Sequence, residues 1–120
     1  QQQLNRYLNS VAEHRLKQIE HEDKEDEHLK AEAAARKAGD TETADDHKNH
    51  AQFHQYKAKF HKTKSLLHLN YANSVLNPQG DQGNSPRVQE MRDRATEYDS
   101  EAAGFAALIQ EKKNHTGAAR

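Results

Sequence analysis

Apolar residues near the start of the chain recur at the spacing of one helix face. These residues are Leu4, Leu8, Val11, Leu16 and Ile19. Residues 20–28 contain no apolar side chain, and the stripe then returns weakly at Leu29 and Ala33. An alanine-rich stretch with high helix propensity follows, and Gly39 is typical of the position just past a helix end. The pattern predicts a first helix from about residue 3 to residue 38.

A second helix is predicted from about residue 43 to residue 77. Thr43 and Asp46 form a Thr-x-x-Asp pattern, in which side chains cap the first turn of a helix. Apolar positions recur every seven residues from Phe53 onward. The helix is expected to end before Pro78, which has no backbone N–H to donate.

A third helix is predicted after a loop at residues 78–85, a stretch rich in Gly, Asn and Pro. Ser85 and Pro86 give an N-cap followed by proline at the first helical position. The helix is expected to span about residues 86–114, followed by a loose tail. Its inward positions follow the most regular apolar pattern of the chain. They are Val88, Met91, Ala95, Tyr98, Ala102, Phe105 and Ile109.

Histidine falls at intervals of seven residues in two series, one in each of the first two predicted helices. The series are His14, His21 and His28, then His47, His54, His61 and His68. Seven residues make two helical turns, so each series lies along one stripe of its helix. Residues 39–43 carry a stop and restart signal, and we expect the chain to fold back about residue 41. That register pairs His28 with His54, His21 with His61 and His14 with His68.

The expected fold is therefore all-α: a three-helix bundle built on a long antiparallel helical hairpin. Charge supports the hairpin, because residues 20–27 carry six acidic residues and residues 48–64 carry five Lys and no acidic residue. In the same register Glu25 faces Lys57. Exposed pairs of this kind add only about 0–1 kcal/mol each, so their expected role is to disfavour other registers.

The predicted core lies between the second and third helices, with Phe105 beside Phe60. Its members are Phe60, Leu67, Met91, Tyr98, Phe105 and Ile109. The 120-residue chain is expected to be a single, thinly cored domain. It is 32% hydrophobic and 31% charged, which also fits a disordered chain, but a net charge of −1 and clear helical periodicity favour folding.

Several classes of protein are excluded by composition. The chain has no Cys, which rules out disulfides, thiol catalysis and Cys-type zinc sites. No apolar run is long enough for a membrane span, and no signal peptide is visible. A sequence that begins with Gln is expected to be a soluble, processed or truncated chain, and its location stays unknown.

A candidate metal site lies near the tip of the expected hairpin. His50 and His54 are four residues apart on the second helix, as are His28 and Glu32 on the first. The fold-back register brings these four side chains level, and three imidazoles with one carboxylate suit Zn²⁺ or Ni²⁺. The alternative is a set of solvent-facing residues that bind metal adventitiously. A Glu-x-x-His motif also starts at Glu25, but the second helix lacks the carboxylates of a di-iron site.

Two further functions can be weighed on the same helices. Facing histidine series would repel each other in acid, because His titrates at about pH 6.5. Acidic neighbours on the first helix favour the charged form and would weaken that effect. Lysines beside Phe53, Tyr56 and Phe60 suggest nucleic-acid binding, but net charge near zero and the lack of an Arg-rich patch indicate no nucleic-acid partner.

The sequence also lacks a glycine-rich phosphate loop, a His-Glu-x-x-His motif and a nucleophile elbow. We therefore expect a non-enzymatic helical protein-interaction module, an effector, adaptor or scaffold fragment. It would present long polar helix faces to a protein partner, by coiled-coil or helix-in-groove recognition. Self-association stays open, since a polar first helix cannot cover all apolar residues. The alternative is a His-rich protein that binds or senses a divalent metal ion.

Overall fold

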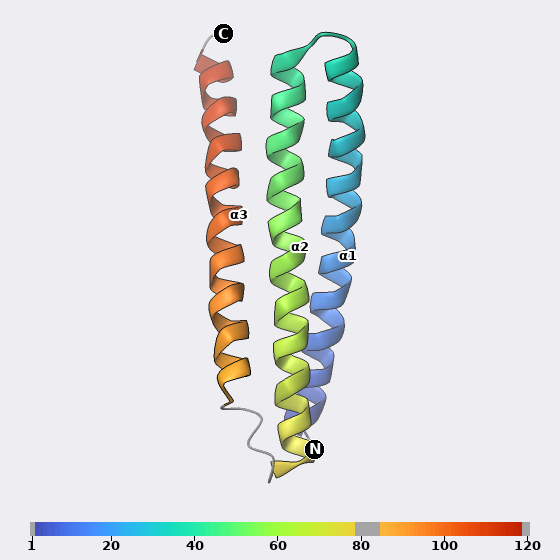
Figure 1. Ribbon diagram of the computed structural model, residues 1–120, viewed down its shortest axis with the longest axis vertical. Coiled ribbons are helices and arrows are strands. Elements are labelled where there is room, and N and C mark those ends of the chain that lie inside the picture. Colours follow the sequence, from blue (N-terminus) through green and yellow to red (C-terminus); the bar gives the residue numbers. More distant parts are fainter. Residues whose placement is uncertain (1, 79–84, 119–120) are drawn as a thin grey trace.

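Three long helices make up almost all of the described chain. The computed structural model describes residues 2–78 and 85–118, with side chains up to residue 114. The helices are α1 (Gln2–Lys37), α2 (Thr41–Leu76) and α3 (Pro86–Ala118). They form a rod of 60 × 23 × 22 Å in which α2 lies between α1 and α3 (Figure 1). The expected all-α three-helix bundle, built on a long antiparallel hairpin, is confirmed.

The bundle is open, because α1 and α3 both pack on α2 while no extensive packing joins α1 to α3 among the described residues. Two side-chain contacts fix the direction of α3. The Lys112 ammonium donates to the Glu42 carbonyl at 3.0 Å, and Arg92 donates to the Tyr71 hydroxyl at 2.8 Å. The end of α3 therefore lies beside the start of α2, and the two helices are antiparallel, as predicted.

A short turn joins α1 to α2 and ends one helix while starting the other. Gly39 has a φ of 80°. Its N–H donates to the Arg36 carbonyl at 3.0 Å, and the Asp40 N–H donates to the Ala35 carbonyl at 2.9 Å. This is the Schellman motif, in which a left-handed glycine closes the last helical turn. The Asp40 carboxylate then caps α2 by accepting from the Thr43 N–H at 3.1 Å and the Thr43 hydroxyl at 2.7 Å.

The predicted start of the second helix was wrong, because Asp40 rather than Thr43 is its N-cap. α2 begins at Thr41, so the turn is centred on Gly39 and not on residue 41. The two helices therefore meet in a different register from the predicted one. Each histidine of α1 falls between two histidines of α2 instead of directly opposite one.

Small residues on α2 let α1 come close to it. These are Ala44, Ala51, Ala58, Ser65 and Ala72, each 5% exposed or less. Each stands three residues before a histidine of α2 or four after one, which is the spacing of the two inward positions of a coiled-coil heptad. Histidine and a small residue therefore alternate along the face of α2 that packs on α1.

The predicted apolar stripe of α1 does not face the hairpin. Val11 is buried, but Leu8, Leu16 and Ile19 are 44%, 59% and 53% exposed. The histidines are the reason, because the helix can bury only one stripe against α2 and their heptad line lies on it. This correction leaves a row of large apolar side chains on the surface of α1.

The α2–α3 core also differs from the predicted one. Leu67 is buried as predicted, whereas the remaining five predicted members are only half-buried: Phe60, Met91, Tyr98, Phe105 and Ile109. The buried residues of α3 are the smaller Val88, Ala95 and Ala102, at 1–2% exposed. Small side chains on this line bring the two backbones together, which leaves the large rings at the edges of the seam.

The third helix ends later than predicted, at Ala118 instead of residue 114. The bond from Lys112 to α2 ties the last turns of α3 to the bundle. The predicted loop falls mostly on residues 79–84, and part of the predicted tail on residues 119–120, which lie outside the described residues. Over the ranges that are described, no helix is long and apolar enough to cross a membrane.

Candidate functional site

A column of histidine rings fills the seam between α1 and α2. We call it the histidine ladder: His14, His21 and His28 of α1 with His47, His54, His61 and His68 of α2. Three hydrogen bonds join the helices through pairs of Nδ1 atoms. They link His14 to His61 at 2.8 Å, His21 to His54 at 2.8 Å and His28 to His47 at 3.0 Å.

Each α1 ring also contacts the next histidine along α2. Ring centroids are 5.4 Å apart for His14 and His68, 5.6 Å for His21 and His61, and 5.7 Å for His28 and His54. The last two pairs are stacked, with planes 7° and 10° apart. The three pairs predicted from sequence are therefore in ring contact, but the hydrogen bonds run to the other neighbour. The reason is the turn at Gly39, which places each α1 ring between two α2 rings.

Each of these hydrogen bonds requires at least one neutral ring, and two neutral rings must be opposite tautomers. In each pair one Nδ1 carries the proton and donates, while the other Nδ1 accepts with its lone pair. A ring protonated on both nitrogens can still donate through Nδ1, so one proton leaves the bond intact. A second proton turns both Nδ1 atoms into donors, and the bond is lost.

Burial favours the neutral form of these rings. His61 is only 6% exposed. Burial, and then the charges of His14 and Lys57, lower the pKa of the His61 imidazole from 6.5 to about 4. Burial and the neighbouring histidines, first His21, lower the pKa of His54 to about 4 as well. At neutral pH these rings act as apolar packing groups that also hydrogen-bond.

The ladder ends at a pair of tyrosines far from the turn. The Tyr7 ring lies 6.3 Å from the His68 ring and 5.4 Å from the Tyr71 ring, measured between centroids. The Nδ1 atom of His68 is buried and has no hydrogen-bond partner. An unpartnered buried nitrogen lowers the cost of removing this ring from the seam.

Phenylalanine rings of α2 cover one side of the ladder. Phe60 meets the His14 ring edge to face at 6.4 Å, and Phe53 meets the His21 ring in the same way at 6.3 Å. The ammonium groups of Lys57 and Lys64 lie 5.4 Å and 5.8 Å from the Phe60 centroid. These lysines place positive charge beside the rings, which disfavours their protonation.

The predicted metal ligands are partly brought together. The His28 ring stacks on His50 at 4.7 Å and on His54 at 5.7 Å between centroids. Glu32, however, accepts two bonds from Arg36 at 3.0 and 2.9 Å. Within the residues that the structure describes, no group of three or more His, Cys, Asp or Glu side chains is arranged to hold a metal ion. The metal site stays a prediction.

A groove of about 170 Å³ gives access to the two predicted ligands of α2. It runs between α2 and α3. Its lining residues are His50, Phe53, His54, Ala106 and Ile109. The imidazoles of His50 and His54 can therefore be approached from solvent across the open bundle.

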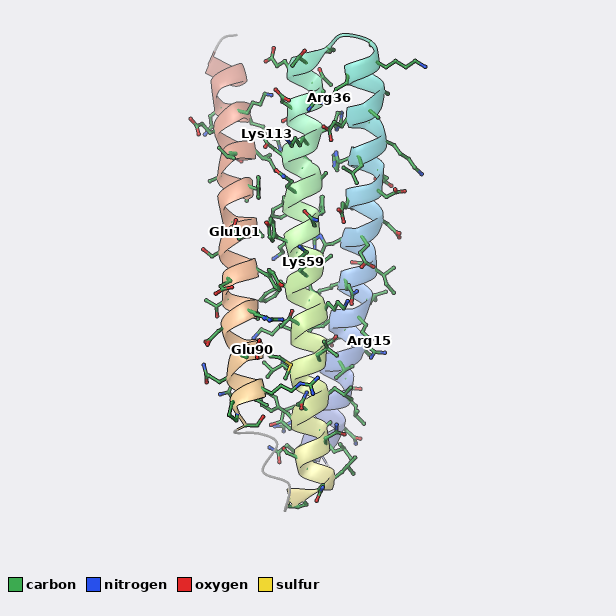
Figure 2. The ribbon with its side chains drawn as sticks, in the orientation of Figure 1. Arg15, Arg36, Lys59, Glu90, Glu101 and Lys113 are labelled. Carbon is green, nitrogen blue, oxygen red and sulfur yellow. The ribbon has the colours of Figure 1, made fainter. Side chains whose placement is uncertain are left out.

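The predicted ion pair between Glu25 and Lys57 is not formed. Glu25 is half-buried, and burial followed by the charge of Glu22 raises the pKa of its carboxyl, while Lys59 lowers it. Across the described part of the hairpin, the ion pair that joins α1 to α2 is Arg36 with Asp45, at 3.0 Å beside the turn. Figure 2 shows Arg36 at this end of the hairpin. The Lys57 ammonium instead lies 5.4 Å from the centroid of the Phe60 ring.

A surface that sequence reasoning missed lies on the outer side of the α1–α2 seam. It is a groove of about 260 Å³ with apolar and basic walls. The lining residues are Arg15, Gln18, Ile19, Lys62, Ser65 and Leu66. The signal was present in the sequence, because the histidine heptad line of α1 competes with Leu16 and Ile19 for the side of α1 that packs on α2.

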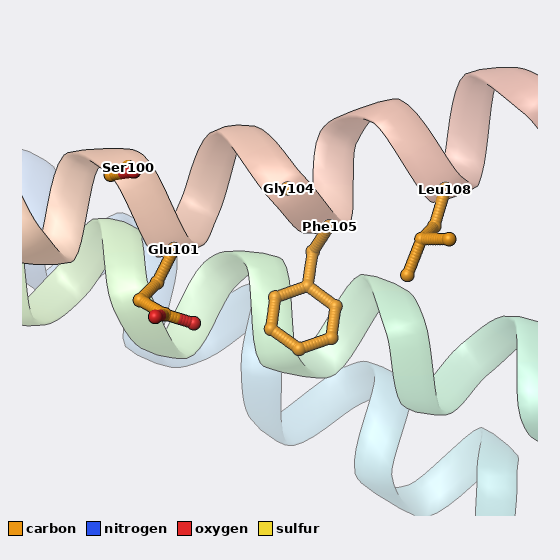
Figure 3. Close-up of a pocket in the computed structure, with 5 residues that line it drawn as sticks. All are labelled: Ser100, Glu101, Gly104, Phe105 and Leu108. Atoms are coloured by element: carbon orange, nitrogen blue, oxygen red, sulfur yellow. The ribbon is translucent and has the colours of Figure 1, made fainter.

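A further hollow lies on α3. Figure 3 shows Phe105 pointing from α3 toward α2, with Gly104 beside it and Leu108 one turn further along. Ser100, Glu101, Gly104, Phe105 and Leu108 line the hollow. Gly104 has no side chain to fill it, and nothing lies within 4 Å of the place where a Cβ would be.

Comparison with known proteins gives no match: no protein-family model, no curated protein and no solved structure is similar to this chain.

Proposed function

We propose that this chain is a non-enzymatic helical interaction module that binds a helix of a protein partner on the outer face of the α1–α2 hairpin. The observation that supports the proposal is the row of exposed apolar side chains on α1. Leu8, Leu16 and Ile19 stand at helical spacing, and each is 44% exposed or more. Such a row on a rigid helix suits helix-in-groove recognition.

The row continues onto α2 through the groove at Ile19. Leu66, on the α2 wall of that groove, is 42% exposed. Arg15 and Lys62 line the same groove and place positive charge at its rim. A partner helix with apolar anchors one turn apart and acidic flanking residues would match both features. Adaptors, effectors and scaffold segments recognise partners in this way.

The test uses a synthetic helical peptide of about 18 residues, with Leu anchors on one face and Glu on its flanks. Fluorescence anisotropy should show binding to the intact chain and weaker binding of a Lys-flanked version. Ile19→Glu or Leu66→Glu should weaken binding roughly tenfold or more. Leu108→Glu is the matched control, because Leu108 is 46% exposed but lies on α3.

Equal binding of the Glu-flanked and Lys-flanked peptides, or equal loss in Leu108→Glu and Leu66→Glu, would contradict the proposal. Sedimentation of the chain without peptide tests whether the same face binds a second copy of the chain. A dimer that dissociates in Leu66→Glu would show that the face binds a second copy of this chain instead.

The second candidate is a divalent-metal protein, supported by the three predicted imidazoles that meet near the turn. His28 is in ring contact with both His50 and His54. Zn²⁺ would need these rings to turn toward one ion and Glu32 to leave Arg36. Titration calorimetry with Zn²⁺ decides: sub-micromolar binding of one ion, lost in His50→Ala and in His54→Ala, would establish the site. Weak binding of several ions would contradict the metal site and leave the interaction module as the proposed function.

A further inference from the structure

The half of the histidine ladder far from the turn contains three rings: His14, His61 and His68. His14 is hydrogen-bonded to His61 at 2.8 Å and lies 5.4 Å from His68 between centroids. His61 is a buried polar side chain of α2 and is only 6% exposed. The Nδ1 atom of His68 is buried without a partner. These rings occupy the seam that apolar side chains would occupy in an ordinary helical hairpin.

Charge on these rings would be poorly compensated. On α1, Lys17 opposes protonation of His14 and the single acidic neighbour Glu13 favours it. On α2, Lys64 opposes protonation of His14 and of His68. Each ring that gains a proton also repels the next, since the rings touch one another along the column.

The other charged groups around His61 act in the same direction. Lys57 of α2 and Lys17 and His21 of α1 all oppose its protonation. From α3, Arg92 reaches the far end of the column by donating to Tyr71, whose ring lies 5.8 Å from the His68 ring. Positive groups from all three helices therefore surround the rings.

The α2–α3 seam has a different composition. The buried residues of α3 are Val88, Ala95 and Ala102, which do not titrate. His50 and His54 of α2 meet α3 at one groove near the α1–α2 turn. We therefore expect acid to act mainly on the contact between α1 and α2. Because α1 packs on α2 and not extensively on α3, it can leave without opening the second seam.

We propose that α1 separates from α2 in mildly acidic solution while α2 and α3 stay together, because His14, His61 and His68 can fill the α1–α2 seam only while they are uncharged. The bundle is then a proton-sensitive device whose moving part is α1. The device does not depend on the partner-binding face proposed above, and its test needs no partner.

The test measures two distances by electron spin resonance in the full chain, which has no Cys of its own. Spin labels on Asn5→Cys and Asn73→Cys report on the α1–α2 contact. Labels on Gln89→Cys and Asn73→Cys report on the α2–α3 contact. All three labelled positions are exposed. The buffer contains EDTA, so that trace metal ions cannot bind the histidines. The first distance should lengthen and broaden as the pH falls from 6.5 to about 4, the range set by His61, while the second stays unchanged.

Two sets of variants assign the effect to these rings. His14→Gln, His61→Gln and His68→Gln together should keep the first distance short at low pH, since glutamine gains no proton there. Should that variant not fold at neutral pH, Lys64→Gln replaces it. Removing this charge should move the midpoint of opening to lower pH by about 0.3 unit. Lys59→Gln is its matched control, because Lys59 acts on Glu25 and not on these rings.

Three results would overturn the proposal. The first is an α1–α2 distance that stays short over the whole range down to about pH 4. The second is simultaneous loss of both distances, which would show unfolding of the whole bundle and not release of α1. The third is opening at an unchanged pH in both the triple histidine variant and Lys64→Gln.

Discussion

The ring of Phe105 lies parallel to the ring of Tyr56, with centroids 5.9 Å apart and planes 12° apart. The contact joins the middle of α3 to the middle of α2, on a seam whose buried residues are mostly Ala and Val. Because Phe105 is only half-buried, Phe105→Ala should cost about 2 kcal/mol, less than the 3–5 kcal/mol of a fully buried Phe. Urea denaturation followed by circular dichroism measures the change.

Leu108→Ala is the control for this substitution, since Leu108 lies one turn away on α3 and is 46% exposed. It should change the free energy of unfolding by less than about 0.5 kcal/mol. Equal effects of the two substitutions would show that α3 is not docked through the stacked rings.

Two glycines should respond to alanine in opposite directions. Gly39 has a φ of 80°, which an L side chain rarely adopts, so Gly39→Ala should destabilise by about 1 kcal/mol. Gly104 lies inside α3, so Gly104→Ala should stabilise by about 0.5–1 kcal/mol through helix propensity. Neither new Cβ would meet an atom within 4 Å, so the backbone alone decides both signs. Thermal melts of the two variants check this, and equal signs would contradict the turn geometry.

The cap of α2 gives a third prediction. Asp40 accepts from the Thr43 N–H and from its hydroxyl. Asp40→Ala should lower the melting temperature, because the first turn of α2 loses the acceptor for that N–H. Asp40→Asn keeps a side-chain oxygen, so its melting temperature should lie between those of the wild type and Asp40→Ala. A melting temperature unchanged in Asp40→Ala would show that α2 does not start at this cap.

The stability of the chain should fall as the pH is lowered from 6.5 to about 4, the interval over which the unfolded and folded pKa values of His61 differ. In that interval the unfolded chain binds a proton on this imidazole that the folded chain excludes. Linkage then lowers the free energy of unfolding with falling pH, by at most about 1.4 kcal/mol per pH unit for one group. Glu25 acts in the opposite sense, because its raised pKa means that the folded chain binds a proton more readily.

Urea denaturation of the chain at several pH values measures this dependence. His61→Gln should reduce the slope of stability against pH, since one of the titrating rings is gone. A slope that is the same in the variant and the wild type would show that His61 does not contribute to the acid sensitivity.

Local signals in the sequence predicted the helices well. Gly39 ended α1, and Ser85 with Pro86 started α3, because these residues act through backbone dihedrals and nearby hydrogen bonds. The cap of α2 was misassigned since Asp40 and Thr43 are both good capping residues. An error of about half a turn in the connecting segment was enough to change which histidines hydrogen-bond between α1 and α2.

The candidate sites were predicted only in outline. The spacing of the histidines indicated that two series face each other, and that is what α1 and α2 show. The sequence did not indicate which nitrogen bonds to which, nor that His61 is buried while Leu16 is exposed. Those facts depend on which stripe each helix buries, and histidine and leucine competed for the same seam.

The sequence by itself therefore determined three helices and the antiparallel hairpin, because helix propensity, capping and heptad spacing are local properties. The tertiary structure decided the register, the hydrogen-bonded histidine pairs and the exposed row on α1. Each of these depends on the relative position of two helices along their axes. That position is set by close packing of small residues such as Ala58 and by the length of the turn at Gly39, which no single segment encodes.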